Sequence, residues 1–468
     1  MKGKVSVSLK YISWHVLMGV LVAWIALGSA FVGCSAKNTP TPTPTRTPKA
    51  LAPTFTPAPP TPTIAPAPTN TLVVQPTATP AGTISPTPAQ STVSSPTLKP
   101  AGTTPTKLPA ATMAGPRRLK SPEYGMQAFL WWRPEVAQRD LELIRDAGFG
   151  WVKQTFAWRD IEGAGKGVFD WERPDRIVQQ VQEHGLKLIV RVDAQPAWAG
   201  GKYPESGPPD KLSDYGDFLT ALATRYKGRI AAYQIWNEPN LNVPGRSEWG
   251  GRPPNPKEYT ELLKVGYQAV KAADPNALVV TAGLAPTSRK DDVAMPDLDF
   301  LRGMYAAGAK PYFDMLGAHG AGYKVPPETD PAVVARDPAL NNNDPSPEDR
   351  KRIYCFRHVE DIRQVMVENG DADKQIVVLE FGWTIDPRPD SPYHWHAVTN
   401  FQQGEYLVAA YKYAKEHWTP WIGLMSLIYM PNVDWTPDRE EYWWSIIEPG
   451  YPELKLRPAY VMLKQMPK

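Results

Sequence analysis

From about residue 121 onward, the chain alternates short apolar runs with longer segments in which apolar positions recur every three or four residues. Short runs rich in Val, Ile, Phe and Trp, bounded by turn-forming residues, are typical of β-strands. Eight such runs occur, at 124–131, 151–158, 187–194, 231–237, 277–284, 313–320, 375–382 and 421–429. The segments between them have helical spacing. Helices are therefore expected near 136–147, 175–184, 213–226, 257–273, 297–307, 350–369, 403–417 and 457–465.

This alternation predicts an α/β fold with a parallel sheet, because parallel strands need a crossover connection that is usually a helix. Eight repeats favour closure into a (β/α)8 barrel, the TIM barrel, over an open doubly wound sheet. A nucleotide-binding open sheet would carry a GxGxxG loop after its first strand, and no such loop follows the first apolar run. We expect one barrel domain over residues 120–468.

Residues 1–34 have the pattern of an export signal. Three lysines lie among the first ten residues, and an apolar run follows from 11 to 33. The run ends in Phe31-Val-Gly-Cys34, which resembles a bacterial lipobox, and this resemblance implies lipidation of Cys34. The alternative is an uncleaved membrane anchor, since about 20 apolar residues can span a bilayer. Both hypotheses place the body outside the cytoplasm, anchored to the bacterial cell membrane.

Residues 35–119 form a Thr/Pro-rich segment. Prolines occupy 19 of the 78 positions from 38 to 115. Proline removes backbone donors and the segment offers few side chains that could build a core, so we expect a disordered stalk.

Charge is distributed unevenly along the chain. Of the 51 Lys and Arg residues, 11 lie in residues 1–120, which contain no Asp or Glu. Residues 121–468, the body of the chain, therefore contain the other 40 basic residues and all 48 acidic residues. A mildly acidic body argues against nucleic acid as a partner, whereas the basic tail suits a membrane or cell-wall surface. The second of the two cysteines, Cys355, is expected to be a small buried hydrophobe.

Two predicted strands end in a glutamate. The fourth ends in the sequence QIWNEPN, which contains Glu238, and the seventh ends at Glu380. Pro239 cannot continue a sheet ladder, so the fourth strand must stop with its carboxylate at the barrel mouth, where catalytic groups of such barrels lie. Strict alternation would send Asn237 and Glu238 to opposite faces, so both reach one site only if the strand end is irregular.

The motifs W-N-E-P at 236–239, L-E-F-G-W at 379–383, F-A-W-R-D-I-E at 156–162 and G-V-F-D-W at 167–171 complete the pattern. The body resembles a glycoside hydrolase of clan A, with the nearest likeness to families 39, 42 and 5. The resemblance implies a retaining enzyme that cleaves β-glycosidic bonds of a poly- or oligosaccharide. No metal site is indicated, because the histidines lack the spacing of metal ligands, and no cofactor is expected. It makes Glu238 the acid/base, Glu380 the nucleophile and Asn237 a ligand of the sugar 2-hydroxyl.

The resemblance also suggests supporting residues. His319 and Tyr323 follow the sixth strand, where family members carry a His and a Tyr around the nucleophile, although the spacing here is longer. Lys153 stands where many members carry an orienting Arg, and since Lys lacks the planar fork we expect a weak role or none. Glu162 is expected to be structural, and Asp193 is left open.

The chain has 17 tryptophans, more than a core of branched aliphatic residues needs. Some rings are therefore expected to line a sugar-binding cleft. Those that follow or end strands at the mouth are candidates, namely Trp158, Trp198, Trp383 and Trp435. Trp151 and Trp421 begin strands and are expected to be structural.

Two other hypotheses remain open at this level. The barrel could be a non-catalytic carbohydrate-binding protein: the two intact glutamates argue against this hypothesis, and the altered positions on the second and sixth strands keep it open. It could also be an inverting or transglycosylating enzyme on the same scaffold, which the separation of the two carboxyl groups would indicate.

Overall fold

A computed structural model describes residues 118–244 and 247–468. The predicted export signal, Cys34 and the Thr/Pro-rich segment as far as residue 117 lie outside the described residues. Within the part of the chain that the structure describes, no helix combines the length and the hydropathy needed to cross a bilayer.

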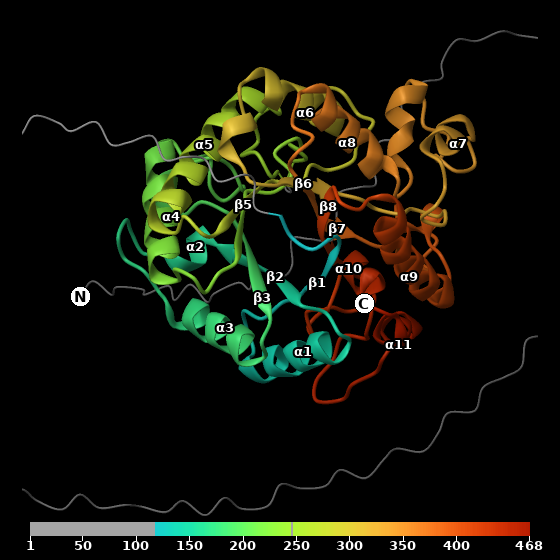
Figure 1. Cartoon of the computed structure of the whole chain (residues 1–468), viewed down its shortest axis with the longest axis horizontal. Helices are drawn as coiled ribbons and strands as arrows, with labels where there is room; N and C mark the ends of the chain where they lie inside the picture. Colours follow the sequence, from blue (N-terminus) through green and yellow to red (C-terminus); the bar gives the residue numbers. More distant parts are fainter. Residues whose placement is uncertain (1–117, 245–246) are drawn as a thin grey trace, which may run out of the picture. The chain divides into compact units, whose positions relative to one another are not determined.

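Eight parallel strands form the centre of the domain, and helices alternate with them around the outside (Figure 1). Each strand overlaps one of the predicted apolar runs. They are β1 (Glu123–Gln127), β2 (Trp151–Ala157), β3 (Lys187–Asp193), β4 (Ala232–Ile235), β5 (Leu278–Thr281), β6 (Leu316–His319), β7 (Ile376–Phe381) and β8 (Ile422–Leu427).

The eight predicted helices occur in order, together with three short helices that the periodicity did not predict. They are α1 (Pro134–Asp146), α2 (Trp158–Ile161), α3 (Glu172–Glu183), α4 (Leu212–Arg225), α5 (Pro256–Ala273), α6 (Asp297–Ala306), α7 (Pro331–Arg336), α8 (His358–Glu368), α9 (Asn400–His417), α10 (Glu440–Trp444) and α11 (Pro458–Gln465). Capping residues in the sequence determine where several of these helices begin. Asn255 caps α5 by accepting from two backbone N–H groups, and Thr399 forms a capping box with Gln402 at α9.

One predicted helix is shorter than expected. The segment 350–369 contains α8 only from His358, preceded by a 3-10 turn, η4 (Glu348–Ile353). Between them, Cys355 is buried in a small cluster with Val325 and Val334, and the Tyr354 hydroxyl donates to Asp344. These contacts hold the chain against the loop after β6, so the helix cannot extend through them. The buried position of Cys355 confirms the expectation for that residue.

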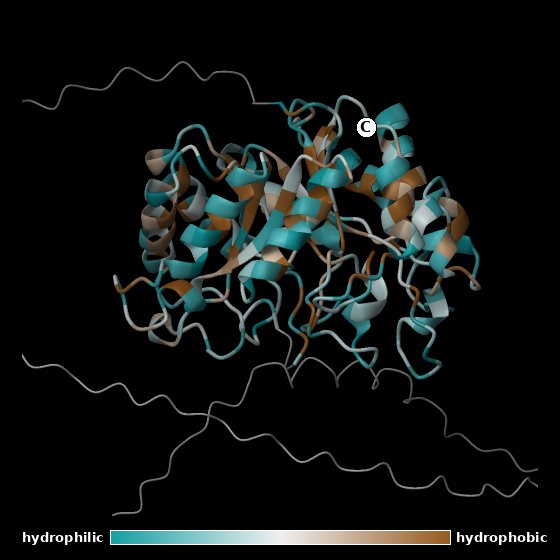
Figure 2. Ribbon diagram, turned by 90° about the horizontal axis from the view of Figure 1, so that it is seen from below, coloured by the Kyte–Doolittle hydropathy of each residue, from teal (hydrophilic) through white to brown (hydrophobic). Residues whose placement is uncertain are grey.

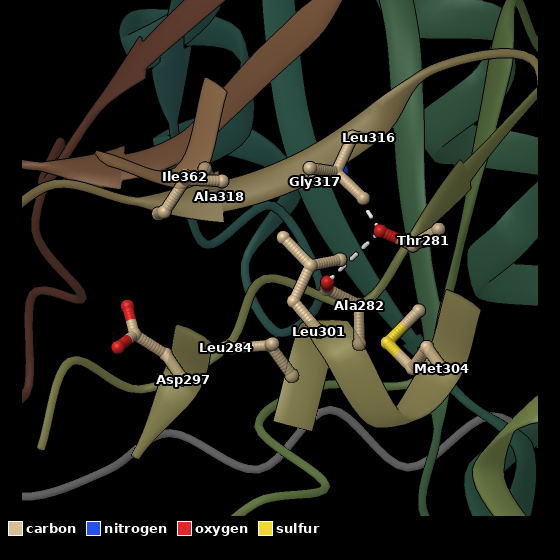
Figure 3. A pocket seen from close by; sticks show the side chains of 10 residues that line it. All are labelled: Thr281, Ala282, Leu284, Asp297, Leu301, Met304, Leu316, Gly317, Ala318 and Ile362. Carbon is tan, nitrogen blue, oxygen red and sulfur yellow. Dashed lines mark hydrogen bonds between the residues drawn. The ribbon is translucent and has the colours of Figure 1, made fainter. Parts of the chain in front are cut away.

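The sheet closes into a barrel, which confirms the predicted fold. Its strand order is β5-β4-β3-β2-β1-β8-β7-β6, and a parallel bridge between Val280 and Met315 joins the two end strands. The Thr281 hydroxyl accepts from Gly317 N at 2.8 Å across this seam and donates to the carbonyl of the next residue, Ala282, at 3.1 Å (Figure 3). A side chain thus supplies a link that the backbone ladder lacks there.

The barrel interior is layered. A buried apolar cluster fills its lower part, where Ile189, Ala232 and Val377 come from different strands. Lys153 follows Trp151 of this cluster by two residues, and Arg191 follows Ile189 by two, so each lies on the interior face one step closer to the C-terminal end of its strand. A second, larger apolar cluster lies between strands and helices, and Figure 2 shows apolar residues along the central strands with polar residues over much of the outer helices.

Candidate active site

The end of β4 leaves regular strand geometry. After Ile235 the backbone takes positive φ angles at Trp236 (69°) and Glu238 (40°), a region that non-glycine residues rarely adopt. Glu238 N donates to Gly283 O at 3.0 Å, which fixes the turn. The irregular strand end that the sequence required for Glu238 and Asn237 is present. Asn237 is buried, and its amide oxygen accepts from Gln234 Nε2 at 3.1 Å.

Glu380 reaches the mouth through a bulge in β7. Val377 and Leu379 face the barrel interior, so strict alternation would turn Glu380 outward. The ladder with β6 shifts by one residue, however, and places His319 opposite Glu380 after pairing Ala318 with Val378. The extra residue re-aims the carboxylate inward, a common use of a bulge beside an active site.

Four side chains from four strands meet at this level. Lys153 Nζ on β2 donates to Glu380 Oε1 at 2.8 Å. His319 Nδ1 on β6 lies 2.9 Å from Glu238 Oε1, and its Nε2 lies 4.0 Å from Glu380 Oε1. One imidazole therefore touches one carboxylate and approaches the other. The contact between Lys153 and Glu380 corrects the expectation that Lys153 has a weak role or none.

The surroundings hold Glu380 in its ionised form. Burial raises the pKa of this carboxyl, but Lys153 above all, followed by His319 and Arg191, outweighs burial and lowers it to about 2. Burial in turn lowers the pKa of Lys153, and the Glu380 carboxylate opposes that effect. The ion pair is almost fully enclosed on the lysine side, where the side chain is 1% exposed.

A second set of charged side chains, Arg191, Asp193 and Glu248, also belongs to the site, and the sequence did not predict that they come together. Arg191 on β3 pairs with Asp193, two residues on, and its other guanidinium nitrogen lies 3.5 Å from Glu248 Oε1. Burial raises the pKa of Glu248 to about 8, helped by the negative charges of Asp193, Glu238 and Glu380 and opposed by Arg191. The two-residue spacing of Arg191 and Asp193 could have signalled their shared face. Glu248 comes from the β4–α5 loop, where no periodicity predicts contacts.

Tyr323 packs against Tyr354 and Trp395, and its expected role as a substrate ligand stays a prediction. Tyr429, just after β8, is the tyrosine near both glutamates. Burial raises its pKa well above the ordinary value, and the charges of Glu380 and Glu238 add to that effect.

Two of the four candidate tryptophans are core residues. Trp158 and Trp383 are both 0% exposed, so neither offers a ring face to a sugar, and these two predictions are wrong. Trp158 stacks on Phe218 and donates to Glu162 Oε2 at 2.6 Å, which confirms the structural role of Glu162. Trp383 donates to Val325 O at 2.9 Å. Strand-end position alone could not reveal burial, because helices and loops cover these rings.

The other two tryptophans lie closer to the surface. Trp198 is partly exposed and donates to Glu162 O at 2.6 Å. Trp435 is 7% exposed and packs against Phe129 and Tyr429. Trp151, by contrast, is buried in the barrel interior, as expected of a structural residue.

Comparison with known proteins gives this arrangement a family. Residues 116–356, slightly more than half of the chain, match the model of the family described as Cellulase (glycosyl hydrolase family 5). That match includes Glu238 and ends before Glu380. A β-galactosidase of Geobacillus kaustophilus is 35% identical over 132 residues, which is 23% of this chain and 19% of that protein. The β-galactosidase BglY of Alicyclobacillus acidocaldarius is 27% identical over 158 residues, covering 30% and 23%.

These alignments span about a fifth of the length of the curated relatives. Two solved structures share the fold. A family 39 glycoside hydrolase of Bacteroides cellulosilyticus WH2 superposes with a TM-score of 0.52 at 18% identity, over 74% of this chain and 63% of that one. GH5_18 of Streptomyces cattleya, solved with GlcNAc, gives 0.52 at 13% identity, over 74% and 80%. By the family model that matches more than half of it, this chain belongs to glycosyl hydrolase family 5.

Proposed function

We propose that the protein is a retaining glycoside hydrolase that cleaves β-glycosidic bonds of a poly- or oligosaccharide by double displacement. The observation that carries this proposal is the His319 ring between the two glutamates, 2.9 Å from Glu238 and 4.0 Å from Glu380. A retaining mechanism needs two carboxyl groups about 5–5.5 Å apart, one ionised and one able to give a proton.

In the first step, the Glu380 carboxylate forms a bond to the anomeric carbon. The glycosidic C–O bond breaks, its electron pair goes to the leaving oxygen, and that oxygen takes the proton of Glu238. In the second step, the Glu238 carboxylate removes a proton from water, whose oxygen attacks the anomeric carbon and releases Glu380. The sugar leaves with its original stereochemistry after two inversions.

The surrounding residues have distinct parts in these steps. Lys153 keeps Glu380 ionised and aimed, since its Nζ bonds one carboxylate oxygen. When His319 carries its proton on Nδ1, this N–H donates to Glu238 Oε1. The other oxygen of Glu238 then carries the proton that is transferred to the leaving group. Asn237 is proposed to bind the sugar 2-hydroxyl, a contact that strengthens in the oxocarbenium-like transition state.

Substrate and location rest on further arguments. The partial relatives are β-galactosidases, so β-galactosides belong among the first substrates to test, beside β-glucans. The N-terminal pattern supports an extracytoplasmic protein anchored to the bacterial cell membrane through a lipid on Cys34 or through an uncleaved signal anchor. The carbohydrate and the membrane would be its partners.

The test compares the purified full-length chain with Glu238→Gln and Glu380→Gln on aryl β-glycosides and β-linked polysaccharides. Both substitutions should lower kcat by about 10²-fold or more, since each removes a group that acts on the reacting atoms. Glu172→Gln, in the first turn of α3 on the outer side of the barrel, is the matched control and should retain activity.

Product stereochemistry and binding separate the alternatives. NMR identifies the anomer that is released first. The β-anomer supports retention, whereas the α-anomer would indicate an inverting mechanism. Equal activity of all variants would contradict the catalytic pair. Binding of a polysaccharide without turnover in the wild type would favour the non-catalytic alternative. That alternative has lost its main support, because Lys153 and His319 both contact the glutamates.

A further inference from the structure

We propose that Glu248 is a specificity-determining substrate ligand: its carboxyl binds a hydroxyl, other than the 2-hydroxyl, of the sugar unit that becomes attached to Glu380. Glu248 lies in the loop between β4 and α5. This inference rests on the proposed function and deepens it, because it names a residue that distinguishes sugars differing at one ring position.

The side chain of Glu248 is as accessible as those of the two glutamates in the proposed reaction. It is 23% exposed, compared with 24% for Glu238 and 17% for Glu380. Asp193, which also pairs with Arg191, is only 3% exposed and offers almost no surface to a bound molecule. Glu248 is therefore a third carboxyl group that a substrate in this site can touch.

Electrostatic interactions show that this carboxyl lies close to both glutamates. The charges of Glu238 and Glu380 both act on Glu248. Arg191, which lies 3.5 Å from Glu248 Oε1, also acts on Glu380. Because interactions between charges weaken with distance, the three carboxyl groups and the guanidinium belong to one site. A sugar whose anomeric carbon meets Glu380 and whose glycosidic oxygen meets Glu238 therefore lies beside Glu248 as well.

Hydrogen bonds and packing fix the main chain around Glu248. The Trp236 indole, directly after β4, donates to Glu248 O at 2.7 Å. Ser247 Oγ accepts from Trp249 N at 3.1 Å and from Gly251 N at 2.8 Å. Trp249 is fully buried, and its ring meets that of Trp236 edge to face with the centroids 6.3 Å apart. The loop therefore presents the carboxyl at a fixed position, as precise recognition of a substrate requires.

Arg191 holds the carboxyl of Glu248 less closely than that of Asp193. Its Nη2 lies 3.5 Å from Glu248 Oε1, which is longer than an ordinary hydrogen bond, whereas its Nε donates directly to Asp193 Oδ2. The guanidinium therefore orients Glu248 by charge and uses its closest donor on Asp193. The two oxygens of Glu248 keep hydrogen-bonding capacity for a hydroxyl group.

The protonation state of Glu248 suits a sugar hydroxyl. Burial raises the pKa of this carboxyl to about 8, while Arg191 opposes the shift and the neighbouring carboxylates add to it. At neutral pH the group is therefore protonated and carries both a donor and an acceptor. A hydroxyl also carries both, so the two groups can bond in either direction. Glutamine has nearly the same shape and the same pair of functions, whereas alanine has neither.

The test measures hydrolysis of aryl β-glucosides, aryl β-galactosides and their 3-, 4- and 6-deoxy analogues by the full-length wild type, Glu248→Ala and Glu248→Gln. On the better parent glycoside, kcat/KM of Glu248→Ala should fall about tenfold, because a hydrogen bond to the sugar is lost. On one of its deoxy analogues the wild type should be about tenfold slower, and Glu248→Ala should add no further loss, because the interacting hydroxyl is already absent. Glu248→Gln should keep most of the activity and the discrimination at neutral pH.

Glu258→Gln is the matched control. The Glu258 carboxylate also pairs with an arginine, Arg252, at 2.8 Å, and it accepts from the Trp249 indole at 3.1 Å. Glu258 belongs, however, to the first turn of α5, a helix on the outside of the barrel (Figure 1). This variant disturbs the same loop without touching the sugar. Its ratio of kcat/KM between parent and deoxy glycosides should therefore equal that of the wild type.

A purely structural role of Glu248 would give a different pattern. If Glu248 only balances the charge of Arg191, Glu248→Ala will lower kcat/KM by the same factor on the parent and on every deoxy analogue, and the proposal is overturned. An unchanged kcat/KM in Glu248→Ala would overturn it as well. So would a Glu248→Gln variant as impaired as Glu248→Ala, because the amide keeps the donor and the acceptor.

Failure of the proposed function can be told apart from failure of this inference. A wild type that hydrolyses none of the glycosides removes the glycosidase, and binding of the parent glycosides is then measured by calorimetry on the wild type and Glu248→Ala. Binding that weakens about tenfold in Glu248→Ala supports the ligand role without catalysis. Absent binding, or binding that Glu248→Ala leaves unchanged, overturns it.

Discussion

At the scale of single residues, the site depends on how Glu380 remains ionised in a place that should neutralise it. Burial disfavours a charged carboxyl, yet the pKa of Glu380 falls to about 2 because Lys153, His319 and Arg191 surround it. Of these residues, Lys153 has the largest effect and is in direct contact, with its Nζ 2.8 Å from Glu380 Oε1. The ionisation of Glu380 therefore depends mainly on one lysine.

Replacing Lys153 by Met should uncover the effect of burial. The pKa of Glu380 would rise, so the acidic limb of the kcat/KM profile would move to higher pH, and kcat/KM at neutral pH would fall by about 10²-fold. The measurement is a pH–rate profile on an aryl β-glycoside. Lys153→Arg keeps the charge and should leave the acidic limb where it is. An unmoved limb in Lys153→Met would contradict the role assigned to the ion pair.

Both glutamates could be found at the residue scale from sequence, because strand ends and Pro239 mark them. Their partners could not. Lys153 and Glu380 are 227 residues apart in sequence, and His319 lies 81 residues from Glu238, so only the closed barrel brings them within reach. The bulge in β7 is equally hidden, since alternation in the sequence alone would direct Glu380 away from the interior.

At the scale of elements, a buried ionic network joins α6 to α8. His358 Nε2 lies 2.7 Å from Asp297 Oδ2, and its Nδ1 lies 3.2 Å from Asp361 Oδ2. Arg352 also belongs to the network, because its guanidinium donates a hydrogen bond to each carboxylate oxygen of Asp361. Burial lowers the pKa of His358, but the two carboxylates outweigh it and raise the pKa to about 9. The imidazole is therefore charged at neutral pH.

This network makes stability depend on pH. A folded-state pKa above the ordinary value of 6.5 means that the contribution of His358 is complete below about pH 6.5 and is lost as the pH rises through about 9. His358→Gln should lower the free energy of unfolding by about 3 kcal/mol at pH 6 and by less at pH 9.5. Guanidinium unfolding at both pH values measures the difference. A deficit that is the same at both would show that His358 does not act through its charge.

At the scale of the whole domain, the eight pairs of neighbouring strands in the barrel are not equally well hydrogen-bonded. Seven neighbouring strand pairs form ladders, two of them with a register shift, whereas β5 and β6 are joined by one bridge with a few backbone hydrogen bonds around it and by the Thr281 hydroxyl. This seam borders a small apolar cavity lined by Leu284, Leu301 and Met304 among others (Figure 3). The hydroxyl therefore satisfies a buried backbone donor, Gly317 N, at the weakest part of the sheet.

Thr281→Val keeps the shape of the side chain and removes the acceptor. Because Gly317 N would be left buried without a partner, the free energy of unfolding should fall by about 1–3 kcal/mol, measured by denaturant unfolding. Thr281→Ser retains the hydroxyl and should lose less. Val and Ser variants of equal stability would indicate that closure does not depend on this bond.

The sequence by itself determined the architecture of residues 120–468 and the two glutamates at the strand ends. Periods of two and of three to four residues are local properties, and each of the eight predicted strands is present in order. Closure of the barrel followed from the number of repeats, and the family from motifs that sit on those strand ends.

The tertiary structure alone decided which side chains surround the glutamates and which rings can meet a substrate. Trp158 and Trp383 carry the same sequence signal as Trp198 and Trp435, yet helices and loops from distant parts of the chain cover only the first pair completely. Burial, bulges and ion pairs between strands are properties of packing. They depend on which segments come together in space, and no local pattern in the chain records that.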